Sequence, residues 1–134
     1  MMASRIICAD VFDGLRQIPD MSVQCVITSP PYYGLRNYQI EPRQWDDGTV
    51  SVLGNDATVD LYVTHIIEIF RAMKRVMHPS ASFWLNLADC YAGGGKHIEP
   101  VKYPDAPKPV RPKQKGMDGK NLLMVPEQVA LALR

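Results

Sequence analysis

The most constraining feature of this sequence is an apolar run, Val23–Thr28, that leads directly into a double proline. Such a run is typical of a strand in a sheet that is covered on both faces. Neither Pro30 nor Pro31 has an N–H group to give to a sheet or helix, and Pro31 keeps Pro30 out of the helical region. The strand must therefore end in a stiff loop with free carbonyls, flanked by the hydroxyl of Ser29 and the ring of Tyr32. A loop of this kind suits the binding of a flat, amine-bearing group such as a nucleobase.

Two further short apolar segments, Arg5–Cys8 and Ser82–Leu87, are predicted to be strands. Strands alternate with helices along the chain, apart from a loop predicted over residues 33–57. This alternation indicates an α/β fold with a parallel sheet and right-handed crossovers. Three strands are few for such a sheet, where about five or six are usual. We therefore expect the chain to form the front part of a larger domain.

Three helices are predicted. Asp10 is placed to cap the first of them. The longest begins after Asp56 or Thr58, follows a helical apolar repeat and ends at His78-Pro79. The last covers Val125–Arg134 and opens with a proline.

Polar residues follow each predicted strand, at Asp10, Ser29–Tyr32 and Asn86–Asp89. Ligands of parallel α/β sheets bind beyond the carboxyl ends of the strands, so we expect these residues to converge on one sheet edge. Each also has a structural explanation: Asp10 suits a helix cap, and Asn86 and Asp89 suit a turn at a strand end. Both explanations stay open.

Residues 93–120 carry five prolines and seven Lys or Arg against three Asp or Glu, whereas the whole chain has a net charge of only +1. They are predicted to be a Gly/Pro-rich basic linker or loop, between a main part at residues 1–92 and the start of a further helix of the same domain at 121–134. Its basic residues suit contact with phosphate, although a solvated linker explains them equally. Six of the seven are predicted to contact phosphate if the segment binds DNA: Lys96, Lys102, Lys108, Arg111, Lys113 and Lys115.

The cysteines argue against a disulfide framework or a metal site. The chain has three and none forms a Cys-x-x-Cys pair, so Cys8 and Cys25, in apolar runs, are expected to be buried reduced thiols. The histidines do not join them at metal-ligand spacing, and no metal is predicted.

No apolar run approaches the ~18 residues of a membrane span and Met1–Asp10 lacks a secretory signal pattern, so a cytoplasmic protein without a membrane partner is expected.

Thr28-Ser29-Pro30-Pro31-Tyr32-Tyr33 resembles the catalytic signature of the amino-group DNA methyltransferases of bacteria and phages. In this family a [Ser/Asn/Asp]-Pro-Pro-[Tyr/Phe/Trp] tetrad receives the target cytosine N4 or adenine N6. Other segments that resemble the family are Ala9-Asp10 with Leu15 and Ile18–Asp20, Trp45–Gly48, Arg75–Pro79, Phe83–Asp89 and Asn121–Arg134.

The resemblance implies a Rossmann-like sheet that binds S-adenosylmethionine, of which this chain would hold about three parallel strands with flanking helices. It implies a catalytic tetrad, Ser29, Pro30, Pro31 and Tyr32, acting on a base flipped out of double-stranded DNA. Ser29 Oγ and the Pro30 carbonyl would accept the two amine hydrogens, and Tyr32 would stack on the base.

The resemblance also gives Asp10 a role in holding the cofactor, with Asn86 and Asp89 at the same edge. A serine in the first tetrad position favours cytosine N4 over adenine N6, and adenine stays open as the alternative.

The sequence departs from the family in one respect. Nothing in it matches the family's glycine-rich cofactor loop, Asp-Pro-Phe-x-Gly-x-Gly-Thr, or its target-recognition region. We therefore expect a truncated form with little activity alone, whose partner is a C-terminal half or a cognate restriction endonuclease. The alternatives are a non-catalytic DNA-binding remnant that uses the basic residues, and a proline-rich ligand for partner domains through Pro104–Pro112.

Overall fold

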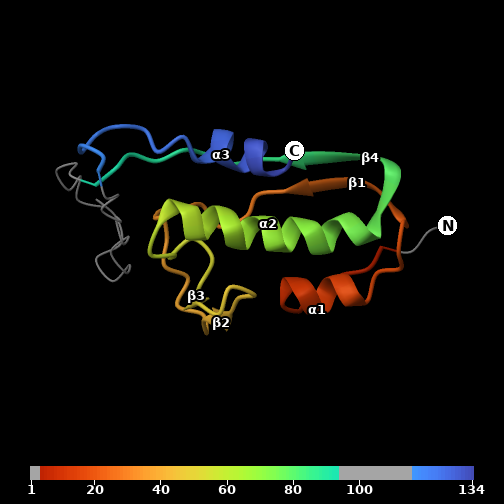
Figure 1. The fold of residues 1–134 in the computed structure, drawn as a ribbon. Coiled ribbons are helices and arrows are strands. Elements are labelled where there is room, and N and C mark those ends of the chain that lie inside the picture. The colour runs from red at the N-terminus through yellow and green to blue at the C-terminus, as the bar shows by residue number, and fades with distance from the viewer. Residues whose placement is uncertain (1–3, 94–115) are drawn as a thin grey trace.

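The computed structural model of the protein describes residues 4–93 and 116–134. The elements follow one another along the chain as shown in Figure 1. They are α1 (Val11–Arg16), β1 (Val23–Thr28), β2 (Arg43–Gln44), β3 (Val50–Ser51), α2 (Val59–Val76), β4 (Met77–Leu85) and α3 (Val125–Ala132). The predicted α/β class is confirmed. The basic residues of the predicted linker that would contact phosphate lie outside the described residues, and the division of the chain into domains stays a prediction.

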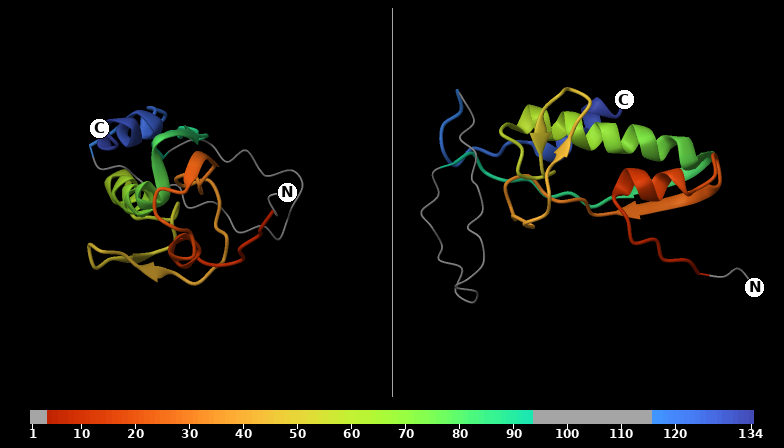
Figure 2. Two further views of the ribbon diagram at one scale, coloured as in Figure 1. Left: turned by 90° about the vertical axis from the view of Figure 1, so that its right-hand side faces the viewer. Right: turned by 90° about the horizontal axis from the view of Figure 1, so that it is seen from below.

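The main sheet has two parallel strands, β1 and β4, joined by a crossover that contains α2. Val26 pairs with Phe83, Ile27 with Trp84 and Thr28 with Leu85. Figures 1 and 2 show α2 running along one side of this pair of strands. The carboxyl ends of both strands therefore lie at the same edge, where the tetrad begins.

The prediction of a strand at Arg5–Cys8 is wrong, so the sheet has two described strands and not three. A short apolar run forms a strand only where a neighbouring strand satisfies its backbone groups. Within the described part of the chain β1 pairs only with β4, and the side chain of Ile6 is 95% exposed. The predicted loop over residues 33–57 also contains the small antiparallel hairpin of β2 and β3.

The helix boundaries follow local signals in the sequence. Asp10 Oδ1 accepts a hydrogen bond from the Phe12 N–H at 3.0 Å, so Asp10 caps α1 as predicted. Of the two candidates for α2, Thr58 is the cap, since its Oγ1 accepts from the Leu61 N–H at 3.2 Å. That helix ends at Val76 and passes directly into β4, slightly before the predicted break.

The core lies along the apolar face of α2. Tyr62, Ile66 and Phe70 are buried there, and the ring of Phe70 meets the edge of Phe83 in β4 at 5.0 Å between centroids. Val129 of α3 is fully buried against the same core. Each large apolar side chain buried in this way contributes roughly 1.5–3 kcal/mol, so α2 is the element that holds the sheet and α3 together.

Among the described residues, no layer covers the opposite face of the sheet, contrary to the expectation of a sheet covered on both faces; we call this the open face. Ile27 is 81% exposed and its neighbour Trp84 is 65% exposed. The expectation that Cys8 and Cys25 are buried is also wrong, because both are exposed. An apolar run shows that a strand is suited to burial on both faces. Whether helices or another sheet actually cover it depends on the rest of the fold.

Candidate functional site

The tetrad leaves the end of β1 as predicted. The hydroxyls of Ser29 and Tyr32 lie 3.1 Å apart in a hydrogen bond, and Ser29 is exposed. Just before the tetrad, the Thr28 carbonyl accepts from the backbone N–H of Asn86 at 2.9 Å. Within the described part of the chain no hydrogen bond reaches the Pro30 carbonyl. The loop therefore presents a hydroxyl and an unpaired carbonyl at neighbouring residues.

The rest of the loop is held from the core side. The hydroxyl of Tyr62 in α2 donates to the Pro31 carbonyl at 2.8 Å. Gly54 has a φ of +91°, and a Cβ at this position would lie 2.9 Å from the carbonyl oxygen of Tyr32. The N–H of Gly34 also donates to the Gly54 carbonyl at 2.7 Å. The Tyr62 bond thus orients the Pro31 carbonyl, and the turn at Gly54 packs closely against the end of the tetrad.

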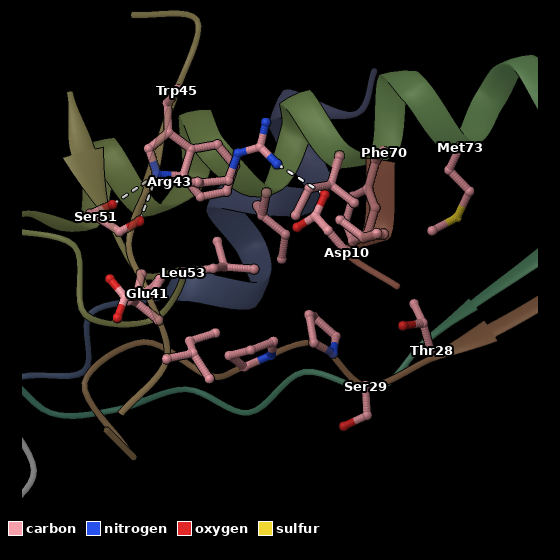
Figure 3. Close-up of a pocket in the computed structure, with 17 residues that line it drawn as sticks. Asp10, Thr28, Ser29, Glu41, Arg43, Trp45, Ser51, Leu53, Phe70 and Met73 are labelled. Atoms are coloured by element: carbon pink, nitrogen blue, oxygen red, sulfur yellow. Dashed lines mark hydrogen bonds and ion pairs between the residues drawn. The ribbon is translucent and has the colours of Figure 1, made fainter. Parts of the chain in front are cut away.

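One side of the tetrad borders a largely apolar hollow of about 470 Å³ (Figure 3). Ser29, Pro30 and Pro31 form one wall, and Asp10 lies at the N-terminal end of α1. The apolar part of the lining comes from the hairpin region and from the face of α2. It includes Ile40, Trp45, Leu53, Ile66, Phe70 and Met73.

Arg43 closes one side of this hollow. Its Nη1 lies 3.2 Å from Asp10 Oδ1, the same oxygen that caps α1 (Figure 3). The guanidinium lies 4.0 Å from the ring centroid of Phe12 and 5.1 Å from that of Trp45. Sequence reasoning missed Arg43, because only the folded hairpin brings it to Asp10, 33 residues away.

The other side of the tetrad borders a second, more polar hollow of about 300 Å³. Its lining is Ser29, Pro30, Tyr32, Leu35, Arg36 and Tyr38. Ser29 and Pro30 line both hollows. These two residues of the tetrad therefore belong to the walls of both hollows.

A buried polar network supports the hairpin beside the first hollow. The Nδ1 of the fully buried His65 lies 2.6 Å from Asp56 Oδ1, and its Nε2 lies 3.1 Å from Asp47 Oδ2. The ring of Trp45 stacks on His65 with centroids 4.3 Å apart. Hydrogen bonds from Thr49, with a smaller effect of His65, hold the pKa of Asp47 below its usual value. The network ties the hairpin that carries Trp45 to α2.

Asn86 and Asp89 line neither of the two hollows. Asp89 instead binds the start of α3, where its Oδ2 accepts from the Met124 N–H at 2.9 Å and its Oδ1 from the Val125 N–H at 3.0 Å. The hydrogen bond between Asn86 and the Thr28 carbonyl uses the backbone N–H of Asn86. The structure thus brings Asp10 and the tetrad together around one hollow, and a cofactor role for Asn86 and Asp89 stays a prediction.

Over residues 4–93 and 116–134, no group of three or more His, Cys, Asp and Glu side chains is arranged to hold a metal ion. No helix in that part of the chain has the length and apolarity needed to cross a membrane.

The chain matches no protein-family model, but it is similar to several curated proteins. The Type II methyltransferase M.XycI of Xanthomonas campestris pv. cyanopsidis is 34% identical over 137 residues, which cover 100% of this chain and 43% of the relative. M.Cfr9I of Citrobacter freundii is 32% identical, with 93% of this chain and 40% of the relative covered. M.SfiI of Streptomyces fimbriatus is 35% identical, with 93% and 25% covered. The chain therefore spans less than half the length of these curated relatives.

Proposed function

We propose that this chain is the amine-binding part of a DNA methyltransferase that transfers the methyl group of S-adenosylmethionine to the exocyclic N4 amine of cytosine. One observation carries the proposal: Ser29 and Pro30 form a common wall between two hollows of different character. A methyl donor and an acceptor base need two spaces that meet at the reacting atoms. The names of the relatives, Type II methyltransferases, support the same reaction class.

The apolar hollow fits the adenosine part of the cofactor. At about 470 Å³ it lies in the size range of small-molecule sites, which are mostly apolar with a few placed polar groups. Both recorded bonds of the Asp10 carboxylate use Oδ1, which leaves Oδ2 able to accept from a ligand hydroxyl or amine. S-adenosylmethionine, when bound, supplies an electrophilic sulfonium methyl group.

The tetrad would prepare the acceptor nitrogen. The lone pair of an exocyclic amine is delocalised into the base ring, which makes the nitrogen a poor nucleophile. If Ser29 Oγ and the Pro30 carbonyl accept its two hydrogens, the nitrogen becomes more tetrahedral and its lone pair is freed. A hydroxyl oxygen has two lone pairs, so Ser29 is able to accept from the amine while keeping its contact with Tyr32. If Asp10 and the apolar lining held S-adenosylmethionine, its sulfonium group would supply the methyl group to this nitrogen and keep the C–S electron pair, and solvent water would take the proton that the nitrogen loses.

The second hollow fits the flipped base. Tyr32 and Tyr38 offer aromatic faces there, and Arg36 offers a positive charge for a nearby phosphate. Stacking on an aromatic side chain contributes about 1–3 kcal/mol per base, which offsets part of the cost of leaving the duplex stack. Cytosine N4 is proposed over adenine N6 on the serine at position 29 alone.

The test joins this chain to the part of M.XycI that it does not match, and expresses the chimera in a bacterial host without DNA amino-methyltransferases. Mass spectrometry of nucleosides from the host DNA should detect N4-methylcytosine, with intact M.XycI expressed in parallel as the positive control for the host and assay. Ser29→Ala should abolish the signal, whereas Ser80→Ala, an exposed serine at the start of β4, should leave it unchanged. N6-methyladenine as the only product would show that adenine is the acceptor.

The second candidate is a non-catalytic DNA-binding remnant, which would use the basic residues predicted to contact phosphate. Binding of that kind should fall steeply with salt and should not respond to S-adenosylmethionine or to Ser29→Ala. A folded chimera that binds DNA in this way and methylates no base would favour the remnant over the enzyme.

A further inference from the structure

The open face of the sheet has the composition of an interface. Cys25 and Ile27 of β1 lie beside Ser82 and Trp84 of β4, in paired register and on the side opposite Phe83. All four are exposed and none carries a charge. An uncharged sheet face with an exposed tryptophan and isoleucine is unusual on the surface of a protein that acts alone.

The outer edge of β4 is open in the same way. Each strand of the main sheet has one described partner, so β4 has a free edge within the described part of the chain. An apolar groove of about 460 Å³ follows this edge, with Trp84, Leu85 and Leu87 on one wall and Pro126, Ala130 and Leu133 on the other. Long unprotected strand edges are ready to pair with a further strand. Trp84 belongs to both the open face and the groove.

We infer that this open face and groove form one docking surface for the remaining part of a Type II methyltransferase, the part that this chain does not span. The inference rests on the proposed function. A match of 137 residues corresponds to only 43% of M.XycI, so more than half of that relative is available to add strands and a covering layer. Two strands also fall short of the usual sheet of about five or six.

The chemistry of the surface favours this occupant over others. Without Lys or Arg on the open face, it offers nothing to the phosphates of a nucleic acid. Apolar side chains on a sheet beside a free strand edge suit a polypeptide that supplies both a neighbouring strand and an apolar layer. A second copy of this chain is the competing occupant.

The experiment co-expresses the complete chain with a tagged segment of M.XycI comprising its unmatched part. Three measurements are made without S-adenosylmethionine or DNA. The first is co-purification on the tag, and the second is thiol labelling of Cys25 in a Cys8→Ser chain. The third is the fluorescence of Trp84, obtained by subtracting the spectrum of the Trp84→Phe complex. We expect a stable complex in which Cys25 is protected and the Trp84 emission shifts to shorter wavelength. Trp84→Ala should weaken the complex by about 30-fold, as for an interface hot spot.

The matched pair of variants is Ile27→Lys and Val50→Lys. Both replace an exposed apolar strand residue, but Val50 lies on the hairpin, away from the open face. Ile27→Lys should abolish co-purification and Val50→Lys should not. Circular dichroism of each isolated variant checks that it is folded. The labelling of Cys25 in the Cys8→Ser chain tests the proposal without either lysine variant.

The proposal is overturned if no complex forms, if Cys25 stays equally reactive in the complex, or if both lysine variants behave alike. Protection of Cys25 in the chain alone, with a doubled mass, would assign the surface to a second copy and overturn it as well. The two proposals fail independently. If the complex forms and protects Cys25 but the chimera methylates no base, the proposed function is refuted and the interface is supported.

Discussion

The hydroxyl of Tyr62, near the start of α2, donates a hydrogen bond of 2.8 Å to the carbonyl of Pro31. Tyr62 is fully buried, and desolvation raises the pKa of its phenol well above the usual value, so the group stays a hydrogen-bond donor at neutral pH. Through this bond the core helix sets the orientation of the proline loop. Among the described residues the neighbouring carbonyl of Pro30 has no hydrogen-bond partner.

Removal of the Tyr62 hydroxyl should loosen the loop. Tyr62→Phe leaves the Pro31 carbonyl without its partner, and we expect the free energy of unfolding to fall by about 1–2 kcal/mol. Tyr33→Phe is the matched control, because the buried hydroxyl of Tyr33 has no hydrogen-bond partner and its loss should be neutral or stabilising. Urea unfolding followed by circular dichroism measures both, and an equal loss in the two variants would contradict the role of Tyr62.

Gly54 is expected to be required for the close approach of its turn to the tetrad. Gly54 and Gly48 both have positive φ, at +91° and +83°, so alanine at either position should cost about 1 kcal/mol of backbone strain. Only at Gly54 would the new Cβ also meet the loop, 2.9 Å from the Tyr32 carbonyl oxygen. Gly54→Ala should therefore lower the melting temperature clearly more than Gly48→Ala, and similar values would show that the turn moves aside freely.

The buried network around His65 should be stabilising as a unit. His65→Leu removes one partner of the buried Asp56 carboxylate, and breaking such a pair typically costs about 3 kcal/mol. His78→Leu, which removes hydrogen bonds with Ser80 at an exposed position, should cost clearly less, about 0.5–1 kcal/mol. Chemical unfolding distinguishes the two. A change in Trp45 fluorescence in the native state should accompany His65→Leu, since the two rings are stacked.

The three thiols should differ in reactivity. Burial, with the nearby charge of Asp89, raises the pKa of Cys90 to about 11, whereas Cys8 and Cys25 are exposed. At pH 8 a thiol reagent should modify Cys8 and Cys25 rapidly and Cys90 slowly, and unfolding in urea should remove the difference. Because the folded pKa of Cys90 lies above the unfolded value of 9.0, its contribution to stability is present below pH 9 and is lost as the pH rises toward 11. Rapid labelling of Cys90 in the folded chain would contradict this.

Local patterns were sufficient for much of the fold. β1 was predicted with its observed bounds, because a continuous apolar run that meets two prolines has one natural end. The cap Asp10 and the proline at the start of α3 were also recognised, since each acts on backbone groups within a few residues. For α2 the sequence left Asp56 and Thr58 as two candidates, of which Thr58 is the cap. These features need no knowledge of what lies elsewhere in the fold.

The errors have one common origin. Arg5–Cys8 has the composition of a strand but no partner among the described residues, and Cys25 lies in a strand whose outer face has no covering layer there. The role of Asp89 at the start of α3 depends on a contact across 35 residues. Neither a partner strand nor a distant backbone group is visible in a local pattern.

The tetrad and its place at the end of a strand were evident from the order of the residues alone. Tertiary structure decided that Ser29 and Pro30 separate two hollows, that Arg43 meets Asp10, and that Ile27 and Trp84 lie side by side on an open face. The reason is physical. Residue type and neighbouring residues set local backbone preferences, whereas a hollow, an ion pair or an exposed face exists only after distant segments have packed together.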